Sequence, residues 1–352
     1  EIWSQIIQNS DGTILRMLKY FYVSKKGYVS KSNLYRSIKD HTKEVGPKKL
    51  AEELNEFSKF YSIIKGGSEQ DLTDYLNMIG GISISTHEEK MKRLFSSIEG
   101  LRLFKVTQVY PLIYSVLKSF VNHEYGSDAG VGEKVVKFIE TLEKYHFINN
   151  AICERIGNEV EKLYADSCKE FSNTEDFVNS LKTLITSLLQ KIAPREEFVS
   201  RFTDIAYSPE SIPLISYIYD RVNNYGVSPA SWVKIFNPNE KISRKTHNIE
   251  HIFPQNPNES FDKESKEVAE LVDNIGNLLV ISYRTNSSLG NLMPLEKITK
   301  LETDLFQSIQ NLDYVRSFIE KYKEYANNWN KELISKRAKD IAEDSYNRVW
   351  KI

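Results

Sequence analysis

Cysteine is scarce in this sequence of 352 residues, which contains Cys153 and Cys168 and no Cys-x-x-Cys pair. A structural zinc site needs four cysteines, or cysteines combined with histidines, at short spacing. The sequence therefore argues against such a site. We interpret the two thiols as core residues of a protein from a reducing, cytoplasmic compartment.

Long hydrophobic runs are also lacking. A bilayer-spanning helix needs roughly 20 apolar residues, and the longest candidate, residues 110–121, is interrupted by Lys118. The first residues do not show the basic, apolar and small-residue pattern of a signal peptide. Residues 126–134 are rich in glycine but do not match a phosphate-binding loop. We therefore expect no membrane segment and no nucleotide site of that type.

Charge of one sign does not predominate, since the net charge is −1. The first 50 residues nevertheless contain ten Lys and Arg against four Asp and Glu. Such a patch could contact phosphates, although a solvated helix face is an equal alternative. Residues 241–300 contain eight basic and eight acidic residues. Tight binding of a nucleic acid by that segment alone is therefore not expected.

Most of the first 225 residues predict helices. Gly46-Pro47 suits a helix start, and apolar residues then recur at helical spacing at Leu50, Leu54, Phe57, Tyr61 and Ile64. Breaks are expected at Gly66-Gly67, at Gly80-Gly81 and over residues 125–132.

The composition changes near residue 208, because seven of the ten prolines lie beyond it. With a turn at residues 223–226, this predicts a helical domain over 1–226 and a second domain over 227–352. The second domain is expected to end in helices from about Leu295. The chain opens inside an amphipathic helix, so we also expect a further domain upstream.

The most informative segment is Asn248-Ile-Glu-His-Ile-Phe-Pro254, followed by Asn277 in a Gly-Asn turn and by Asn286. An acidic residue beside a histidine, followed by two polar ligands, is the residue order of an HNH nuclease site. Residues 248–253 predict a strand that Pro254 stops. Residues 278–282 predict a second strand, and a helix is expected after a polar loop around Asn286. Together they would form the ββα arrangement on which HNH chemistry is mounted.

These residue types suit the hydrolysis of a phosphodiester. His251 is the candidate general base for a water molecule. Charge grows on the phosphoryl oxygens, and a divalent cation held by oxygens of Glu250 and Asn286 would stabilise it. Asn277 is expected to fix the loop that carries His251. Since adjacent strand residues point to opposite faces, Glu250 and His251 can serve one site only if the strand ends or bulges there.

Other residues near this motif have a functional and a structural interpretation. His247 shares a strand face with His251, although a solvent-exposed strand histidine is the preferred interpretation. Lys297 begins a helix-like segment and could meet a phosphate, whereas an exposed lysine is the default. Arg284 and Asn291 flank Asn286, and either could contact DNA; Asn291 is also the substitute metal ligand.

Residues 249–255, 275–278, 286–291 and Lys297 together resemble the C-terminal HNH domain of GmrSD-like restriction enzymes, which includes the SspE-type, phosphorothioate-sensing phage-defence nucleases. The resemblance implies His251 as general base, Glu250 and Asn286 as ligands of Mg²⁺ or Mn²⁺, Asn277 as a structural residue and Lys297 as a phosphate contact. The sequence departs from the broad HNH pattern in having Glu for the usual Asp and Asn for the final His. Residues 329–338 also resemble that domain's closing helices.

The resemblance implies a mainly α protein with a helical scaffold and a small ββα-metal module that has C-terminal helices. It implies that the partner is phage DNA or modified DNA. The implied role is restriction of this DNA in the bacterial cytoplasm. Such families carry an N-terminal nucleotide-using domain with an Asp-Gly-Gln-Gln-Arg-like motif, which this sequence lacks. One HNH site cuts one strand, so nicking is expected, and a double-strand break would need a dimer or two events. Two alternatives stay open: a catalytically silent HNH-like module that binds DNA or protein, and an RNA-directed nuclease.

Overall fold

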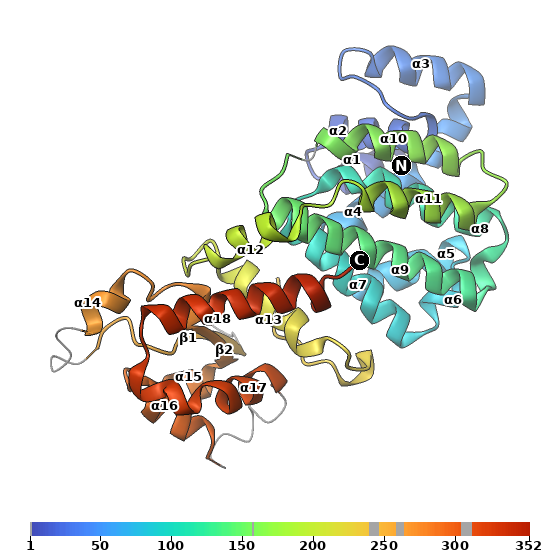
Figure 1. The fold of residues 1–352 in the computed structure, drawn as a ribbon. Coiled ribbons are helices and arrows are strands. Elements are labelled where there is room, and N and C mark those ends of the chain that lie inside the picture. Colours follow the sequence, from blue (N-terminus) through green and yellow to red (C-terminus); the bar gives the residue numbers. More distant parts are fainter. Residues whose placement is uncertain (1, 157, 239–245, 258–263, 304–311) are drawn as a thin grey trace. The chain divides into compact units, whose positions relative to one another are not determined.

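The computed structural model describes the chain apart from residues 1, 157, 239–245, 258–263 and 304–311. The described residues are mainly helical and contain one sheet of two strands (Figure 1), which confirms the expected mainly α class. Among these residues, no helix is long and apolar enough to cross a bilayer. Contacts divide the chain into a first unit, residues 1–192 with Ile352, and a second unit, residues 193–351.

The first unit consists of α-helices joined by short connections. They are α1 (Ile2–Ser10), α2 (Ile14–Lys26), α3 (Leu34–Val45), α4 (Pro47–Gly66), α5 (Glu69–Ile79), α6 (Ile82–Ser85), α7 (Glu88–Leu103), α8 (Tyr110–Asn122), α9 (Ala129–His146), α10 (Asn158–Phe171) and α11 (Phe177–Leu189). Short 3₁₀ segments, η1 (Thr107–Val109) and η2 (Tyr125–Ser127), precede α8 and α9, and a π-helical segment, η3 (Phe147–Ile152), extends α9.

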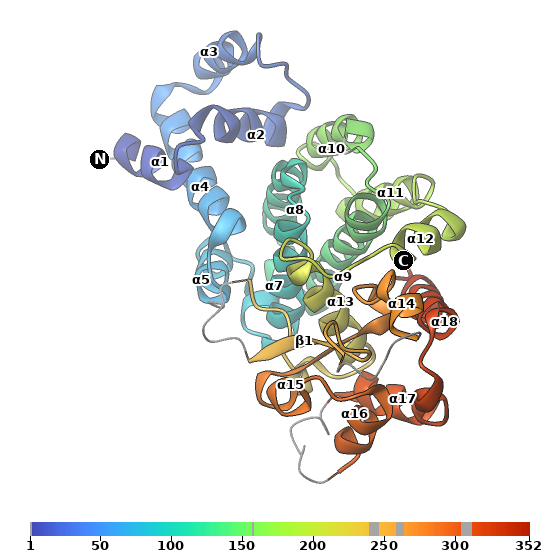
Figure 2. The ribbon, with the colours of Figure 1, turned by 90° about the vertical axis from the view of Figure 1, so that its left-hand side faces the viewer.

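Helix α8 lies in the core of the first unit, where α2, α4, α9 and α10 pack against it (Figure 2). Ten of its 13 residues are buried, as expected for a helix that is apolar on all sides. The lysine that interrupts this apolar run, Lys118, pairs with Glu56 at 2.9 Å. The longest apolar run of the sequence is thus a core helix of a globular unit.

The helix boundaries expected in this half are largely found. Helix α4 begins at Pro47, and its predicted apolar stripe is buried. The expected breaks at the two glycine pairs coincide with the ends of α4 and α5. Within the glycine-rich segment, a Cβ at Gly126 would lie 2.1 Å from the carbonyl oxygen of Gly80. That glycine therefore permits close packing of two backbone segments.

His146 is fully buried at the end of α9. Its Nε2 lies 2.8 Å from the hydroxyl of Tyr164, and its Nδ1 contacts the side-chain oxygen of Asn150. Burial lowers the pKa of His146 from 6.5 to about 4, and the hydrogen bond with Asn150 only partly opposes this. The imidazole is therefore neutral in the folded protein at neutral pH.

We predict that this histidine makes the stability of the protein depend on pH. The unfolded state binds a proton near pH 6.5 and the folded state only near pH 4, so stability should fall as the pH drops through this window. The loss between pH 7.5 and pH 5 should be about 2 kcal/mol. In urea unfolding, the loss of stability between these pH values should be larger in the parent than in His146→Gln by about this amount. Equal pH dependence in both proteins would contradict the prediction.

The second unit contains the sheet and the remaining helices. Its α-helices are α12 (Arg195–Thr203), α13 (Ile212–Asn224), α14 (Glu264–Ala269), α15 (Tyr283–Leu289), α16 (Pro294–Leu301), α17 (Asp313–Tyr322) and α18 (Lys331–Asp344). The strands are β1 (His247–His251) and β2 (Leu278–Ser282). Short 3₁₀ or π-helical segments are η4 (Pro229–Ser231), η6 (Ile275–Asn277), η8 (Lys323–Asn328) and η9 (Ser345–Val349).

Strands β1 and β2 pair antiparallel, with His251 opposite Leu278 and His247 opposite Ser282. Strand β2 has the predicted bounds, and its four apolar residues are buried. Helix α15 follows β2 directly, since the hydroxyl of Ser282 accepts a hydrogen bond from the backbone N–H of Thr285 as an N-cap. The chain order strand, strand, helix is therefore present in the second unit.

The division between the units differs from the boundary near Gly226 that the composition change and the turn at residues 223–226 predict. Helices α12 and α13 precede Gly226 but belong to the second unit. Ile215 and Tyr219 of α13 pack into the same core as both strands, and the Tyr219 hydroxyl donates to the carbonyl of Leu278 at 2.6 Å. The turn after α13 exists, but the hydrophobic core extends across it.

Candidate functional site at the end of the strand pair

Strand β1 ends at His251, because the chain there turns onto Asn277. The backbone N–H of Ile252 donates to the backbone oxygen of Asn277 at 2.8 Å. The next N–H, of Phe253, donates to the side-chain oxygen of Asn277 at 2.9 Å. Strand β1 therefore ends directly at Glu250 and His251, as the sequence analysis requires if the two residues are to lie near one site.

Asn277 is completely buried, and its side chain is saturated with hydrogen bonds. Its Oδ1 accepts from Phe253 and from the indole N–H of Trp329, each at 2.9 Å. Its Nδ2 donates to the carbonyls of Phe253 at 2.9 Å and Val272 at 2.7 Å. A carboxamide has two donors and two acceptor positions, and all four are used. This geometry supports the expected structural role of Asn277.

Helix α18 holds the turn that carries Asn277. The buried guanidinium of Arg337 donates to the carbonyls of Gly276 at 2.7 Å and Leu278 at 2.9 Å. A Cβ at Gly276 would lie 2.1 Å from the carbonyl oxygen of Ile334, so no other residue fits this crossing without a shift of the helix. The closing helix and the turn thus fix each other.

Glu250 and Lys297, both buried, and the half-buried Asn286 form a polar group that we call the Glu250 cluster. Glu250 is 6% exposed and Lys297 is 2% exposed, and the ammonium of Lys297 contacts Glu250 Oε1. Asn286 donates its Nδ2 to Glu250 Oε2 at 2.9 Å and to the carbonyl of Ile249 at 3.0 Å. Burial raises the pKa of Glu250, against the attraction of Lys297, and lowers the pKa of Lys297, against that of Glu250.

His251 binds a different partner. Its Nε2 lies 2.9 Å from Oδ1 of Asp273, and Gln255 donates to the same oxygen at 2.7 Å. The ring of Tyr207 meets the imidazole edge to face, with centroids 5.0 Å apart. Burial lowers the pKa of His251, although Asp273 opposes this, and the nearby charge of Lys297 lowers it further. These contacts favour a neutral imidazole at neutral pH.

The two motif residues therefore face separate partners, as strand alternation requires. Lys297 connects the two groups, because its Nζ also donates to the carbonyl oxygen of His251 at 2.6 Å. The structure thus brings together four residues that the sequence singles out, namely Glu250, His251, Asn286 and Lys297, around the end of β1.

As they lie, Glu250 and Asn286 do not fit a divalent cation between them. Asn286 turns its amide nitrogen to Glu250, and the carbonyl of Ile249 fixes this orientation because it needs a donor. The carboxylate of Glu250 already faces the ammonium of Lys297. Within the described part of the chain, no group of three or more His, Cys, Asp or Glu side chains has the geometry of a metal site. The oxygens that the sequence assigns to Mg²⁺ do not converge.

Two local expectations need correction. Asn286 lies within helix α15, not in a loop, because Ser282 caps a helix that begins directly after β2. Lys297 is buried and bound to Glu250, so its ammonium does not lie at the surface where a phosphate would meet it.

The remaining candidates lie at the edge of the site. Arg284 and Asn291 are exposed, on α15 and just after it, respectively. His247 is half-buried at the start of β1, and its Nδ1 lies 3.1 Å from the hydroxyl of Thr246. A cavity of 720 Å³ beside Asn291 is lined mainly by residues of 288–296 together with Phe253 and Trp329.

Sequence reasoning missed Asp273 and Tyr207. Asp273 lies just before the Gly-Asn turn, which was the one available signal for it. Tyr207 comes from the α12–α13 connection, whose backbone pairs with the segment before the turn: the Tyr207 N–H donates to the Asp273 carbonyl at 2.7 Å, and Ala206 bridges to Asn274. No pattern within a few residues of the sequence predicts a pairing between segments this far apart.

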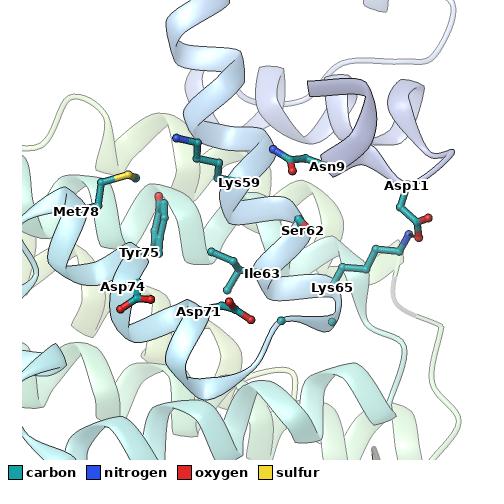
Figure 3. A pocket seen from close by; sticks show the side chains of 12 residues that line it. Asn9, Asp11, Lys59, Ser62, Ile63, Lys65, Asp71, Asp74, Tyr75 and Met78 are labelled. Atoms are coloured by element: carbon teal, nitrogen blue, oxygen red, sulfur yellow. Dashed lines mark hydrogen bonds and ion pairs between the residues drawn. The ribbon is translucent and has the colours of Figure 1, made fainter. Parts of the chain in front are cut away.

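The first unit has a hollow of its own, with a volume of 730 Å³, between α1, α4 and α5. Lys59 and Tyr75 line it, and Lys65 reaches Asp11 at 2.7 Å at one side (Figure 3). Both basic and acidic side chains line it, so its lining favours no single class of ligand.

The second unit thus contains an antiparallel strand pair, a helix that follows it directly, and the histidine, carboxylate and two asparagines expected of a nuclease domain. In agreement with this, residues 192–344 match the family of GmrSD restriction endonucleases, C-terminal domain. This segment of the chain is therefore similar to the C-terminal domain of GmrSD restriction endonucleases. The match begins where the second unit begins. A comparison with curated proteins found no match.

We predict that Asn277→Ala strongly destabilises the second unit. The substitution leaves four buried backbone or indole groups without a partner, and each costs roughly 1–3 kcal/mol. Chemical unfolding of Asn277→Ala should therefore show a loss of several kcal/mol. Asn291→Ala, at an exposed position, should change stability by less than about 0.5 kcal/mol. Similar values for both variants would contradict the structural role.

We also predict strong coupling between Glu250 and Lys297. Lys297→Met leaves a buried carboxylate unpaired and should cost roughly 3–5 kcal/mol. The double variant Glu250→Gln/Lys297→Met should recover most of this loss in urea unfolding. Lys300→Met, an exposed lysine of the same helix, serves as the control and should be nearly neutral. If the stability losses of Glu250→Gln and Lys297→Met simply add in the double variant, the ion pair is absent in solution.

Proposed function

We propose that the second unit is an HNH-type endonuclease that hydrolyses phosphodiester bonds of DNA, with His251 as general base. The observation that carries the proposal is the position of this imidazole. It lies at the end of β1, beside the turn of Asn277, within a domain of a restriction-endonuclease family. Its lowered pKa favours the neutral form that can accept a proton.

The proposed reaction needs one proton acceptor in the protein. A water molecule passes a proton to His251 as its oxygen forms a bond to phosphorus. The bond from phosphorus to the 3′-oxygen breaks, and the leaving oxygen takes a proton from solvent. The products are a 5′-phosphate and a 3′-hydroxyl. Because the unit has one such histidine, each event cuts one strand, and the proposed product is a nick.

The biological role that we propose is restriction of phage or modified DNA. Support comes from the family description, which names restriction endonucleases. The proposed arrangement includes a nucleotide-using regulatory domain of the same protein as a partner of this nuclease. Exposed Arg284 and Asn291 are the proposed DNA contacts at the edge of the site.

The resemblance implies Mg²⁺ or Mn²⁺ as cofactor, whereas the Glu250 cluster does not present converging oxygens. We therefore assign no step to a metal ion. The plasmid assay described below compares cutting with Mg²⁺, with Mn²⁺ and with chelator. The closed cluster also favours a second candidate, a catalytically silent HNH-like module that binds DNA. In that case the ion pair of Glu250 and Lys297 would be a structural element only.

The test is relaxation of a supercoiled plasmid by the purified chain with Mg²⁺, with Mn²⁺ and with chelator. We expect nicked circles as the first product and a loss of roughly 100-fold or more in rate for His251→Ala. His87→Ala, an exposed histidine of the first unit, is the matched control and should cut like the parent. A structured RNA is tested as an alternative substrate. Cleavage of this RNA in preference to the plasmid would indicate an RNA-directed nuclease.

Two results would overturn the proposal. Supercoiled DNA that stays intact with every divalent metal would favour the silent binding module. Cutting by His251→Ala at the parental rate would place the chemistry elsewhere or in a contaminant.

A further inference from the structure

We propose that Asp273 is the positioning residue for His251, and that it makes Nδ1 the nitrogen that accepts the proton. The proposal rests on the proposed nuclease function and adds a residue to which neither the motif nor the family match assigns a role. It starts from the contact of Asp273 Oδ1 with His251 Nε2 at 2.9 Å.

The chemistry of this contact fixes the tautomer. An ionised carboxylate can only accept hydrogen bonds, so the proton of a neutral His251 must lie on Nε2. The lone pair is then on Nδ1, at the opposite side of the ring from Asp273. When Nδ1 takes a proton, the carboxylate faces the resulting imidazolium and stabilises its charge.

The carboxylate itself is held on a fixed backbone. The carbonyl of Asp273 accepts from the N–H of Tyr207 at 2.7 Å. The next residue, Asn274, donates its side chain to the carbonyl of Thr203 at 2.7 Å and accepts from the N–H of Gly276 at 2.9 Å. Hydrogen bonds to the α12–α13 connection and to the Asn277 turn thus fix the backbone of Asp273 on both sides.

Two further contacts restrict this pair. Gln255 donates to the oxygen that binds His251, at 2.7 Å, so the carboxylate is oriented from a second side. The ring of Tyr207 stands nearly perpendicular to the imidazole, at 80°, and limits its rotation. A histidine that is bonded at one nitrogen and packed on one face has a defined direction for its other nitrogen.

The first measurement reads the tautomer without any cutting. Nitrogen-15 spectra of the full chain, compared with His251→Ala to assign the signal, should show a neutral His251 protonated at Nε2. Asp273→Ala should lose this preference. Asp313→Asn, an exposed aspartate of the same unit, should keep it. A parental tautomer in Asp273→Ala would overturn the proposal.

The second measurement is kinetic. In plasmid nicking, Asp273→Asn should lower kcat by roughly 10²-fold or more and leave KM nearly unchanged, because the change affects a proton transfer and not DNA binding. Asp273→Glu should recover part of the loss, since it restores the carboxylate. Urea unfolding of the parent, Asp273→Asn and Asp273→Glu shows whether a lower kcat comes from loss of the fold.

The outcomes distinguish the two proposals. If the parent cuts, His251→Ala does not, and Asp273→Asn cuts like the parent, the positioning role is wrong while the nuclease stands. If neither the parent nor any variant cuts, the proposed function fails, and the nitrogen-15 spectra still decide whether Asp273 sets the tautomer.

Discussion

The carboxamide of Asn277 joins the parts of the second unit that the site depends on. It binds the chain leaving β1, the segment before the turn and the indole of Trp329. Since all its hydrogen-bonding positions are used inside the protein, its contribution is geometric. It holds the chain at the end of β1, directly after Glu250 and His251. A polar side chain so deeply buried is costly unless it is completely satisfied, and here that requirement fixes the site.

The C-terminal helix extends this constraint. Arg337 is buried, yet among its described partners are backbone carbonyls of the Asn277 turn and the hydroxyl of Tyr219, and its guanidinium lies over the ring of Phe318. The same turn packs against α18 so closely that Gly276 has no room for a Cβ. The segment with Glu250 and His251 is short in sequence, but the Asn277 turn beside it is held by a helix whose Arg337 lies 61 residues beyond Gly276. This agrees with the extent of the family match, which runs to residue 344.

Local patterns were sufficient where local forces decide the structure. The apolar run of β2 and the proline start of α4 were predicted because burial and backbone geometry act within a few residues. The helix around Asn286 was not predicted, since its polar sequence has modest helix propensity and forms on the Ser282 cap. Tyr207 and the pairing of its backbone with residues before the turn depend on contacts between distant segments. No periodicity records such contacts, so the composition shift near residue 208 and the turn at residues 223–226 could not reveal that the core of the second unit includes α13.

Lys297 gives the site a property that neither motif residue has alone. Its ammonium contacts the carboxylate of Glu250 and the carbonyl of His251, so it touches the two consecutive residues that strand alternation separates. Because the cluster is buried, a change of charge at Glu250 is poorly screened by solvent. Lys297 already lowers the pKa of His251, and any group that displaced it from Glu250 would alter that effect. The lysine therefore couples the electrostatics of Glu250 and His251.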